Sequence, residues 1–590
     1  MAPLLRPGLP YYLIASLPIL AVFGLIPAAL YLHAGEEWSF SWTFLLRLGA
    51  LGVPGLIAVA LLIRGLALVS ARAAALLAIL LFCLGAFLLL AHVYAPLQIG
   101  PLDGSPMVSK EPLRPTLFEL AILALLVVAL GFLVRGRGRG LAIASLFTAA
   151  LWLVCAGYFG AMAWAARPDD PPARPAVRAS AAGGNVYHFV LDTLQTDAFR
   201  TVLDRLGIVD RLTGFNLFAS NISNYINTVP SSASYFTGTL YDNGKYKPWT
   251  RSWRDRGLFP TLRAAGYTTW MYAPFAYWEN EHIDHFWHNI ALYEEETGVA
   301  AASFYDFGQV WLASLAPNFL TNEALPPAAR LRDRLFAVVA GGPNPLSIEA
   351  GLDQYASVLM LQRVLREEPA RPPRGQYVYA HAVLPHGPYV LAPDCRFVGK
   401  RELRRQHDEQ GLKEGYLGQA ECALRLVARF LDQLKALGRY DAATIVIHAD
   451  TGNRIGFFDA SVRDDGAKTL GWNSYRLRSQ VYALLAIKPP GAKGPLQVRD
   501  TPTQLVDLFP TLLDLLDLAS PDYPVYGRSV YAAGGAPREA RFGFDPARRH
   551  GPEIVEVRVD DPVHLARSPL TVIGPAIDPA TWRGASRTDG

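Results

Sequence analysis

The chain has 590 residues, of which 51% are hydrophobic and only 18% are charged, and its formal net charge is +4. Soluble domains average about 25% charged residues, so this composition excludes a wholly soluble protein of ordinary surface polarity. So small a net charge on so long a chain also gives no support for a nucleic acid partner.

Apolar stretches of membrane-spanning length, about 20 residues each, occupy most of residues 1–165. There are five, namely Tyr11–Leu32, Phe44–Ile63, Ala73–His92, Leu117–Val134 and Leu141–Ala165. The first is too long for the core of a cleaved signal peptide, and four more follow it. The sequence therefore predicts a five-span transmembrane domain over residues 1–165.

Basic residues between these stretches follow an alternating pattern. One set of loops carries Arg6, Arg64, Arg72, Arg135, Arg137 and Arg139. The other carries Glu36, Glu37, Asp103 and Glu111, with only Lys110 and Arg114 as clear cations. Since cytoplasmic loops are enriched in Lys and Arg, the amino terminus is predicted to be cytoplasmic. An odd number of spans then places the remaining chain outside, which in a bacterial inner membrane means the periplasm.

A segment rich in Pro, Ala and Gly follows the last span and is predicted to be a linker over residues 166–184. The rest of the chain has the composition of a globular domain. It contains two cysteines, Cys395 and Cys422. An oxidising compartment permits a disulfide between them, and two buried thiols are the alternative.

Short apolar strands alternate with amphipathic helices after the linker. The predicted strands are Val186–Leu191, Tyr267–Tyr272, Tyr377–Leu384, Ala443–His448 and Val481–Ile487. The predicted helices are Leu258–Ala265, Leu352–Arg366, Leu417–Leu437 and Thr503–Leu516. This pattern indicates an α/β domain with a mostly parallel sheet covered by helices on both faces. Ligands bind beyond the carboxyl ends of such strands, so polar residues at strand ends are the candidates for function.

Two carboxylates follow predicted strands. Asp192 ends the first strand and Asp450 follows the fourth, and carboxylates in such places are natural ligands for hard cations. Asp192 has an alternative role as the N-cap of the following helix. His448 lies two residues before Asp450 on the same strand face, where a histidine is more often a hydrogen-bonded core residue than a ligand.

Thr228 and His386 are the other candidates. Thr228 precedes Pro230, which fits the first turn of a helix, so its hydroxyl would face free backbone N–H groups. This setting favours an activated nucleophile, and a simple N-cap is the alternative. His386 lies in a Pro-His-Gly-Pro loop just past the third strand, a likelier place for a functional histidine than His381 inside that strand.

Taken in order, these segments resemble the sulfatase branch of the alkaline phosphatase superfamily. The strand ending in Asp192 is similar to the family's first metal-binding strand, and Thr228–Gly238 resembles its nucleophile turn and helix. The His386 loop resembles a substrate-binding loop, and Ala443–Gly452 resembles the strand before the second metal-binding aspartate. The resemblance covers residues 185–530, which implies a catalytic domain there and a C-terminal extension over residues 531–590.

The nucleophile segment departs from the sulfatase pattern. Sulfatases that carry formylglycine have Cys or Ser, then x-Pro-x-Arg, whereas here Thr228 begins the segment and Ser232 stands at the arginine position. Threonine cannot yield that aldehyde. A threonine nucleophile after five spans resembles membrane-anchored phosphoethanolamine transferases and lipoteichoic-acid-type phosphoglycerol transferases. That resemblance implies transfer of a phospho-alcohol headgroup from a membrane lipid donor to an envelope glycan or lipid acceptor.

The same resemblance implies a site. One divalent ion (Zn, Mn or Mg) would be held by Asp192, Asp450 and Thr228, and Thr228 would attack phosphorus. His386 would bind the phosphoryl group or assist the leaving group, and the remaining substrate-binding candidates are Ser231 and Asn227.

The position after the late aspartate is a further departure. The family usually has His or Asn there, but here Asp450 is followed by Thr451, which with His448 is a weaker candidate ligand. Two alternatives to the transferase therefore stay open: a sulfatase-like hydrolase of phosphate or sulfate esters, and a catalytically weakened module that binds envelope polysaccharide.

Overall fold

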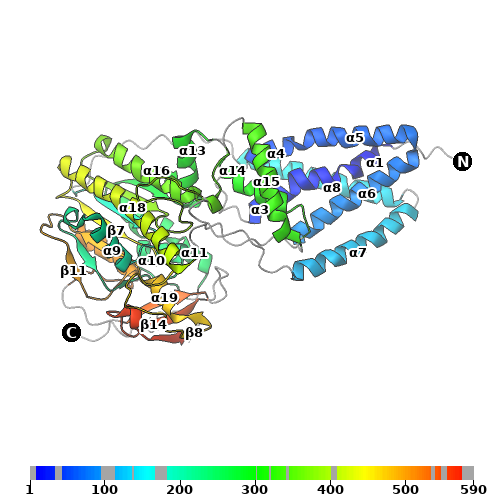
Figure 1. Ribbon diagram of the computed structural model, residues 1–590. Coiled ribbons are helices and arrows are strands. Elements are labelled where there is room, and N and C mark those ends of the chain that lie inside the picture. Colours follow the sequence, from blue (N-terminus) through cyan, green and yellow to red (C-terminus); the bar gives the residue numbers. More distant parts are fainter. Residues whose placement is uncertain are drawn as a thin grey trace. The chain divides into compact units, whose positions relative to one another are not determined.

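The computed structural model describes most of the chain in two compact units. The described residues are 8–33, 43–94, 113–135, 139–165, 183–242, 244–299, 302–317, 320–340, 344–399, 408–532, 539–545 and 554–574. The first unit comprises residues 1–173 with residues 297–349, and the second comprises residues 174–296 with residues 350–590 (Figure 1).

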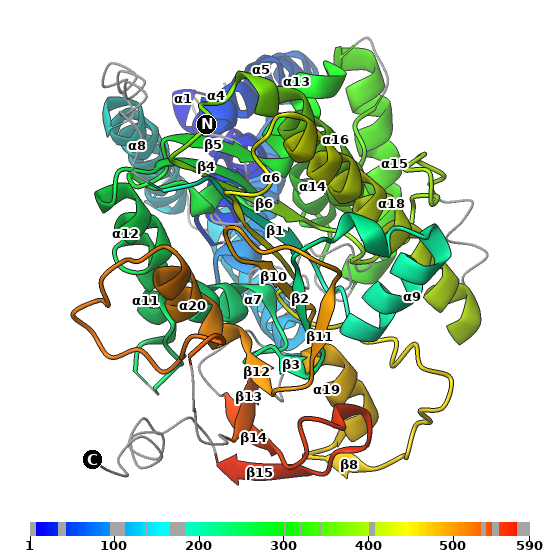
Figure 2. The same cartoon turned by 90° about the vertical axis from the view of Figure 1, so that its left-hand side faces the viewer.

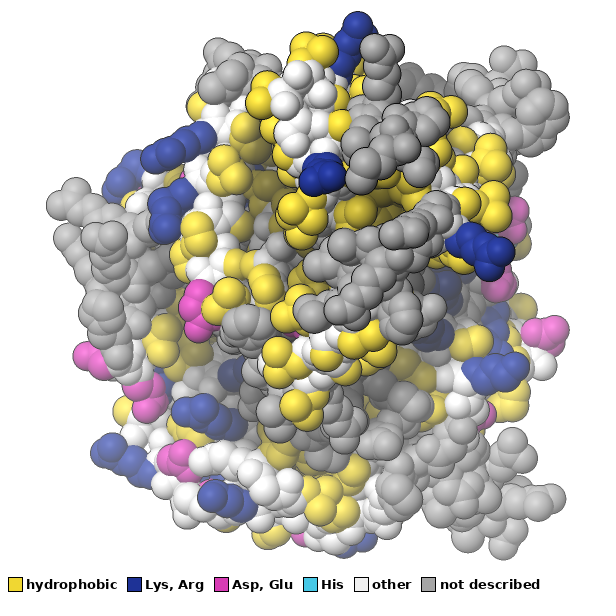
Figure 3. All heavy atoms as spheres, turned by 90° about the vertical axis from the view of Figure 1, so that its right-hand side faces the viewer, with side chains coloured by type: hydrophobic (Ala, Val, Ile, Leu, Met, Phe, Trp, Pro, Cys, Tyr) yellow, Lys and Arg dark blue, Asp and Glu magenta, His cyan; other side chains and the backbone are white. Residues whose placement is uncertain are grey.

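The N-terminal part of the first unit is helical. Its elements are α1 (Leu9–Ala15), α2 (Leu17–Leu20), the π-helix η1 (Ala21–Leu25), α3 (Ile26–His33), α4 (Thr43–Ala50), α5 (Gly52–Val69), α6 (Ala71–Tyr94), α7 (Leu113–Arg135) and α8 (Arg139–Ala165). Many apolar side chains on these helices are exposed, including Leu68 and Val69 at 85% each, and such side chains are prominent in Figure 3. Apolar exposure on this scale is typical of helices that face lipid.

Four stretches in the described chain are long and apolar enough to cross a membrane. They are Leu9–Leu32, Leu45–Val69, Ala71–Ala91 and Arg139–Ala161. The predicted span Leu117–Val134 lies in α7, whose qualifying apolar part, Thr116–Leu126, is shorter. The count of five is therefore not confirmed. Residues 166–182 of the predicted linker lie outside the described residues, as do residues 34–42 and 95–112.

The second unit is built on an eight-stranded sheet with the order β11-β2-β10-β7-β1-β6-β4-β5. Its strands are β1 (Val186–Leu191), β2 (Asn216–Phe218), β4 (Thr268–Ala273), β5 (His285–His288), β6 (Gln376–Ala382), β7 (Thr444–His448), β10 (Leu485–Lys488) and β11 (Gln497–Arg499). Within this sheet only β10 runs antiparallel to its neighbours. The predicted mostly parallel sheet is confirmed.

Helices cover both faces of the sheet (Figure 2). Tyr187 and Phe189 of β1 both pack on Phe430 of α18 (Glu409–Ala436), with ring centroids 5.2 Å apart. His188 points to the opposite face and lies near Tyr235, which belongs to the helix over residues Thr228–Thr237 (α10). The first face also carries α9 (Thr196–Leu206) and α16 (Leu352–Glu367), and the second carries α10 (Thr228–Thr237), α12 (Leu258–Ala264) and α20 (Leu508–Leu515). Alternation along β1 therefore puts His188, Val190 and Asp192 on the α10 side.

The observed element boundaries differ most from the predicted ones where a helix and a strand meet. The predicted strand Val481–Ile487 is shorter in the structure, because Val481 ends the helix α19 (Ser474–Val481) and β10 begins at Leu485. The predicted helix Thr503–Leu516 begins with the two-residue strand β12 (Thr503–Gln504). Towards the C-terminus, β13 (Ala540–Phe544), β14 (Val555–Val559) and β15 (Leu570–Gly574) form an antiparallel sheet.

The expected disulfide is present. Cys395 and Cys422 are bonded with their Cα atoms 4.9 Å apart, and the bridge joins the segment after the His386 loop to α18. Cys83 and Cys155 are free.

Replacing Cys395 by Ser should lower the free energy of unfolding by about 3 kcal/mol under oxidising conditions, because the bridge closes a loop of 27 residues. The check is the melting temperature with and without reductant. Reductant should lower the melting temperature of the unaltered protein to that of Cys395→Ser. The control Cys83→Ser should melt at the same temperatures as the unaltered protein, with and without reductant. Equal melting of the unaltered protein and Cys395→Ser without reductant would contradict this role.

Candidate active site

Three side chains converge where the central strands end. Val190 of β1 pairs with His381 of β6 on one side and with His448 of β7 on the other. Asp192 follows β1, and Asp450 follows β7 by two residues. One ligand atom from each of Asp192, His381 and Asp450 lies within 4.8 Å of the other two.

The converging atoms have no partners of their own. Among the described residues, Asp192 Oδ1, His381 Nε2 and Asp450 Oδ2 are buried without a hydrogen bond, and His381 Nε2 lies 3.8 Å from Asp192 Oδ2. Burying polar atoms unpaired is costly. One imidazole nitrogen and two carboxylates make a donor set that suits a divalent cation, so these residues fit the metal that the sequence implies.

The second oxygen of Asp450 is held by backbone groups. Asp450 Oδ1 accepts hydrogen bonds from the N–H groups of Thr193 at 3.1 Å and Thr451 at 2.8 Å. Thr193 has φ 65°, a strained conformation for threonine, which directs its N–H towards Asp450. Gly452 follows, and a Cβ there would lie 2.0 Å from the carbonyl oxygen of Ser479. The turn after β7 is therefore closely constrained.

The two carboxylates differ in proton affinity. Burial and the adjacent Asp192 raise the pKa of Asp450 to about 6. Burial also acts to raise the pKa of Asp192, but His386 and His381 outweigh it and hold that pKa below its ordinary value. The shifts follow from crowding two carboxylates and two imidazoles in a small buried volume.

Thr228 lies beside this cluster. It is the first residue of α10, it is partly exposed, and its hydroxyl is close enough to Asp450 to act to lower the pKa of that carboxyl. Asn227 is the N-cap of α10 without a capping side-chain bond. Ser231 is buried, and its Oγ donates to the carbonyl oxygen of Asp450 at 2.6 Å, so it ties the start of α10 to the end of β7.

The His386 loop is fixed by two glutamines. Gln354 Nε2 donates to the carbonyl oxygen of Gly387 at 2.9 Å, and Gln419 Nε2 donates to that of His386 at 2.9 Å. The His386 Nδ1 lies 2.7 Å from the carbonyl of Gly387 and so donates to it, which leaves Nε2 for substrate. His386 is partly exposed, and it is close enough to Asp192 to act to lower the pKa of the Asp192 carboxyl.

His448 is not part of the cluster. Its Nδ1 lies 2.9 Å from the carbonyl oxygen of Ala449 and must donate to it, so its Nε2 accepts from His188 Nε2 at 2.7 Å. His188 Nδ1 then accepts from the hydroxyl of Tyr377 at 2.8 Å. Burial lowers the pKa of His448 to about 3, so its ring is neutral, and both of its nitrogens are used in these hydrogen bonds.

His381 was missed as a site residue, since a histidine inside a strand is usually part of the core. Its Nδ1 lies 3.1 Å from the hydroxyl of Tyr379, which lies 2.9 Å from that of Tyr235, and Tyr235 continues to Ser232 at 3.0 Å. The available signal was strand alternation, since His381 faces the same side as Asp192. The chain of hydroxyls orients the ring and leaves Nε2 directed at the carboxylates.

Replacing Tyr379 by Phe should weaken the affinity for a divalent cation by about tenfold to 100-fold, the usual cost of losing a group that orients a metal ligand. Isothermal titration of the full chain with Zn²⁺ and with Mn²⁺ measures the change. Tyr377→Phe is the matched control on the same strand, since Tyr377 contacts His188 and not His381. Equal losses in the two variants would show a general effect of the core instead.

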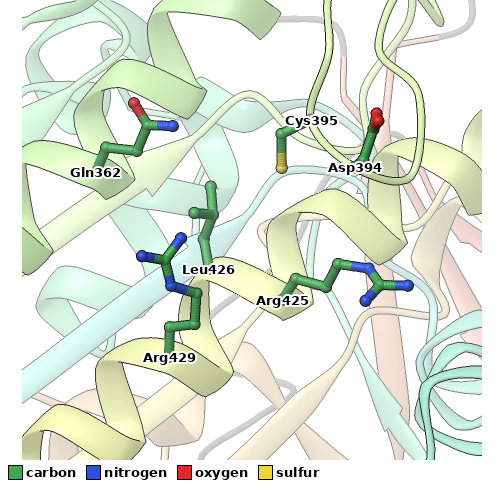
Figure 4. Close-up of a pocket in the computed structure, with 6 residues that line it drawn as sticks. All are labelled: Gln362, Asp394, Cys395, Arg425, Leu426 and Arg429. Atoms are coloured by element: carbon green, nitrogen blue, oxygen red, sulfur yellow. The ribbon is translucent and has the colours of Figure 1, made fainter.

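One surface pocket lies apart from these residues. It has a volume of about 390 Å³ and lies beside the disulfide, between α16, α18 and the loop of Asp394 (Figure 4). Its lining residues are Gln362, Asp394, Cys395, Arg425, Leu426 and Arg429. None of the residues predicted to be catalytic, metal-binding or substrate-binding lines it.

The chain matches the sequence model of the sulfatase family over residues 187–518, which is more than half of its length. The chain belongs to the sulfatase family. The resemblance seen in the order of Asp192, Thr228, His386 and Asp450 is thereby confirmed at the level of the family. A search of curated proteins finds no match.

Solved structures of similar fold include two hydrolases and one periplasmic domain. The phosphonate monoester hydrolase SpPMH from Silicibacter pomeroyi is 19% identical, with a TM-score of 0.42 over 68% of this chain and 93% of that one. The phosphonate monoester hydrolase of Agrobacterium radiobacter is 16% identical, with a TM-score of 0.38 over 68% and 90%. The C-terminal periplasmic domain of EcEptC from Escherichia coli, in complex with Zn, is 12% identical, with a TM-score of 0.39 over 62% and 91%.

Proposed function

We propose that this sulfatase-family protein transfers a phospho-alcohol headgroup from a membrane phospholipid to an envelope glycan or lipid, through a covalent phosphothreonine at Thr228. The observation that carries the proposal is the place of Thr228 at the start of α10, close to Asp450 and beside a buried cluster of unpaired ligand atoms. We also propose that the protein lies in a bacterial inner membrane with this site in the periplasm.

The residues at the start of α10 favour phosphoryl transfer over sulfate hydrolysis. Thr228 is a secondary alcohol and cannot become formylglycine, and Ser232 replaces the arginine of formylglycine-dependent sulfatases. The Ser232 hydroxyl instead lies 3.0 Å from that of Tyr235, in the chain that leads to His381. Phosphoryl transfer needs a nucleophile held in line and charge stabilisation, and both are compatible with an unmodified hydroxyl.

Asp192, His381 and Asp450 would hold the divalent cation, with Thr228 adjacent to them. When bound, the cation would supply positive charge that lowers the pKa of a hydroxyl and stabilises charge on phosphoryl oxygens. The mixed nitrogen and oxygen donors suit zinc or manganese better than an all-oxygen site would.

The remaining chemistry belongs to the chain. Thr228 Oγ1 forms a bond to phosphorus and gives its proton to the nearby Asp450, while the bond from phosphorus to the glycerol oxygen breaks. His386 Nε2 donates the proton that the leaving oxygen needs. The acceptor hydroxyl then gives its proton to His386 and attacks phosphorus, the bond from phosphorus to Thr228 Oγ1 breaks, and Thr228 takes its proton back from Asp450.

The test is release of a labelled headgroup from phospholipid vesicles by the full chain, with diacylglycerol and the headgroup followed separately. Transfer requires both products, with the headgroup on an added polysaccharide or lipid acceptor. Headgroup found only as the free phosphate ester would favour the phosphohydrolase alternative. Absence of turnover in the presence of Zn²⁺, Mn²⁺ and Mg²⁺ would refute the enzymatic proposal and favour a binding module.

A further inference from the structure

A helical hairpin of the first unit is inserted in the sequence of the second. It consists of α14 (Ala302–Ala313) and α15 (Thr321–Ala340) and lies within residues 297–349, which group with the N-terminal helices. Segments of the second unit precede and follow it in the chain. The chain therefore passes between the two units three times, whereas a simple membrane anchor needs one passage.

The hairpin packs on the membrane helices through an apolar cluster. The buried members are Ala21, Ile26, Leu45, Leu48, Leu88, Phe307, Val310, Trp311, Ala313, Leu325 and Ala328. Trp311 anchors it, because its Nε1 donates to the carbonyl oxygen of Val22 at 2.8 Å and its ring lies 5.7 Å from that of Phe23. Val22 and Phe23 belong to the π-helix η1, a local irregularity of the first span that often marks a functional position.

The cluster involves one end of each membrane helix it touches. Ile26 lies in the second half of the first span, Leu45 begins the second, and Leu88 comes near the end of the third. Phe159, packed against the cluster, comes near the end of the last. Because these residues belong to one cluster, these span ends lie together on the side of the helix bundle where α8 ends.

A buried arginine organises the hairpin itself. Arg332 Nη1 donates to Gln309 Oε1 at 2.7 Å and lies 3.7 Å from Asp306 Oδ1, and its guanidinium stacks 3.7 Å from the centre of the Tyr305 ring. Asp306 Oδ2 also accepts from the backbone N–H of Ile348 at 3.0 Å. These bonds join α14 to α15 and to the end of the insertion, so the hairpin is a preformed unit.

The outward side of α15 mixes apolar and cationic side chains. Leu331 and Leu335 are 47% and 45% exposed, and Arg330 and Arg334, one turn apart beside them, are exposed as well. Exposed leucines next to arginines are typical of helices that lie in the interface of a bilayer, where the leucines contact acyl chains and the arginines contact lipid phosphates.

We infer that the α14–α15 hairpin lies in the headgroup layer of the membrane, docked on the span ends through Trp311, with Arg330 and Arg334 bound to anionic phospholipid. The helices that α14 and α15 pack on are the apolar ones expected to face lipid. The hairpin therefore lies next to the bilayer and is not surrounded by bulk water. It would tie the catalytic domain to the bilayer at a second place in the sequence, close to the lipid class that the proposed function needs.

A fluorescent probe on a cysteine at position 331 tests this in nanodiscs. The full chain carries Leu331→Cys with Cys83 and Cys155 replaced by Ala, and Val498→Cys in β11 is the matched control, since Val498 is also half exposed, at 50%. Nitroxide-labelled lipid should quench the probe at 331 at least about threefold more than the probe at 498, and aqueous iodide should show the reverse order.

The contact of Arg330 and Arg334 with anionic lipid is tested separately. Raising the fraction of anionic lipid should increase lipid quenching at 331, and Arg330→Gln with Arg334→Gln should remove that dependence. Iodide quenching at 331 equal to that at 498 would overturn the placement in the membrane. Protection of 331 from both quenchers would overturn it in favour of a protein partner, and quenching indifferent to lipid charge would overturn the headgroup contact. The experiment needs no substrate, so its outcome is independent of headgroup transfer.

Discussion

Replacing Thr228 by Ala should abolish headgroup release from phospholipid, by at least about 1,000-fold, since loss of a nucleophile removes the covalent route entirely. The hydroxyl of Thr228 lies at the start of α10, close enough to Asp450 to act to lower the pKa of that carboxyl, which belongs to the ligand cluster. Acid quenching during turnover, followed by mass spectrometry of the peptide that contains residue 228, should find the headgroup phosphate on the unaltered chain alone.

Two further variants make the Thr228 experiment specific. Thr228→Ser keeps an attacking oxygen and should keep measurable activity and the phosphorylated peptide. Ser231→Ala should keep the covalent intermediate, because the Ser231 hydroxyl bonds to the backbone carbonyl of Asp450. Full activity of Thr228→Ala, or a phosphate on another residue, would refute the assignment of the nucleophile.

The second large effect concerns the metal. Replacing His381 by Ala should reduce the affinity for Zn²⁺ or Mn²⁺ by at least about 100-fold, since even groups that only orient a ligand contribute tenfold to 100-fold. The physical reason is that His381 Nε2 is the one nitrogen in the buried cluster and has no other partner among the described residues. Metal content after dialysis, measured by mass spectrometry, checks this without any enzyme assay.

A second substitution tests whether a histidine at position 451 can take over the metal-binding role of His381. The family places a histidine or asparagine directly after the late aspartate, where this chain has Thr451. In the His381→Ala background, Thr451→His should recover part of the lost affinity, whereas Thr451→Ala should not. His448→Gln is the control for a buried histidine outside the cluster. If His381→Ala retains the metal stoichiometry of the unaltered chain, His381 is not a ligand.

Local sequence patterns were enough to predict those features of the protein that depend on residues close together in the chain. Apolar runs show where helices can cross a membrane, since spanning depends on length and composition alone. Alternation of apolar strands and amphipathic helices indicates a mostly parallel sheet, and polar residues at strand ends mark Asp192 and Asp450. The disulfide could be expected because the part of the sequence after residue 184 contains only two cysteines, Cys395 and Cys422.

The composition of the site depended on register, which local patterns do not contain. His381 and His448 are both strand histidines, and both pair with Val190 from opposite sides. Only packing separates them. The carbonyl of Ala449 and the ring of His188 take both nitrogens of His448, while the Tyr379 hydroxyl takes only one of His381. The sequence-based preference for His448 as a weaker ligand therefore rested on closeness to Asp450 along the chain.

The low charge and high hydrophobicity of the chain show by themselves that part of it is apolar enough to cross a membrane, because that capacity depends on length and composition. Composition and motif order also determine the family. Tertiary structure alone decided that residues 297–349 belong with the N-terminal apolar helices and that His381 belongs with Asp192 and Asp450. Both depend on contacts between residues far apart in the chain, and such contacts form only when the fold brings separate surfaces together.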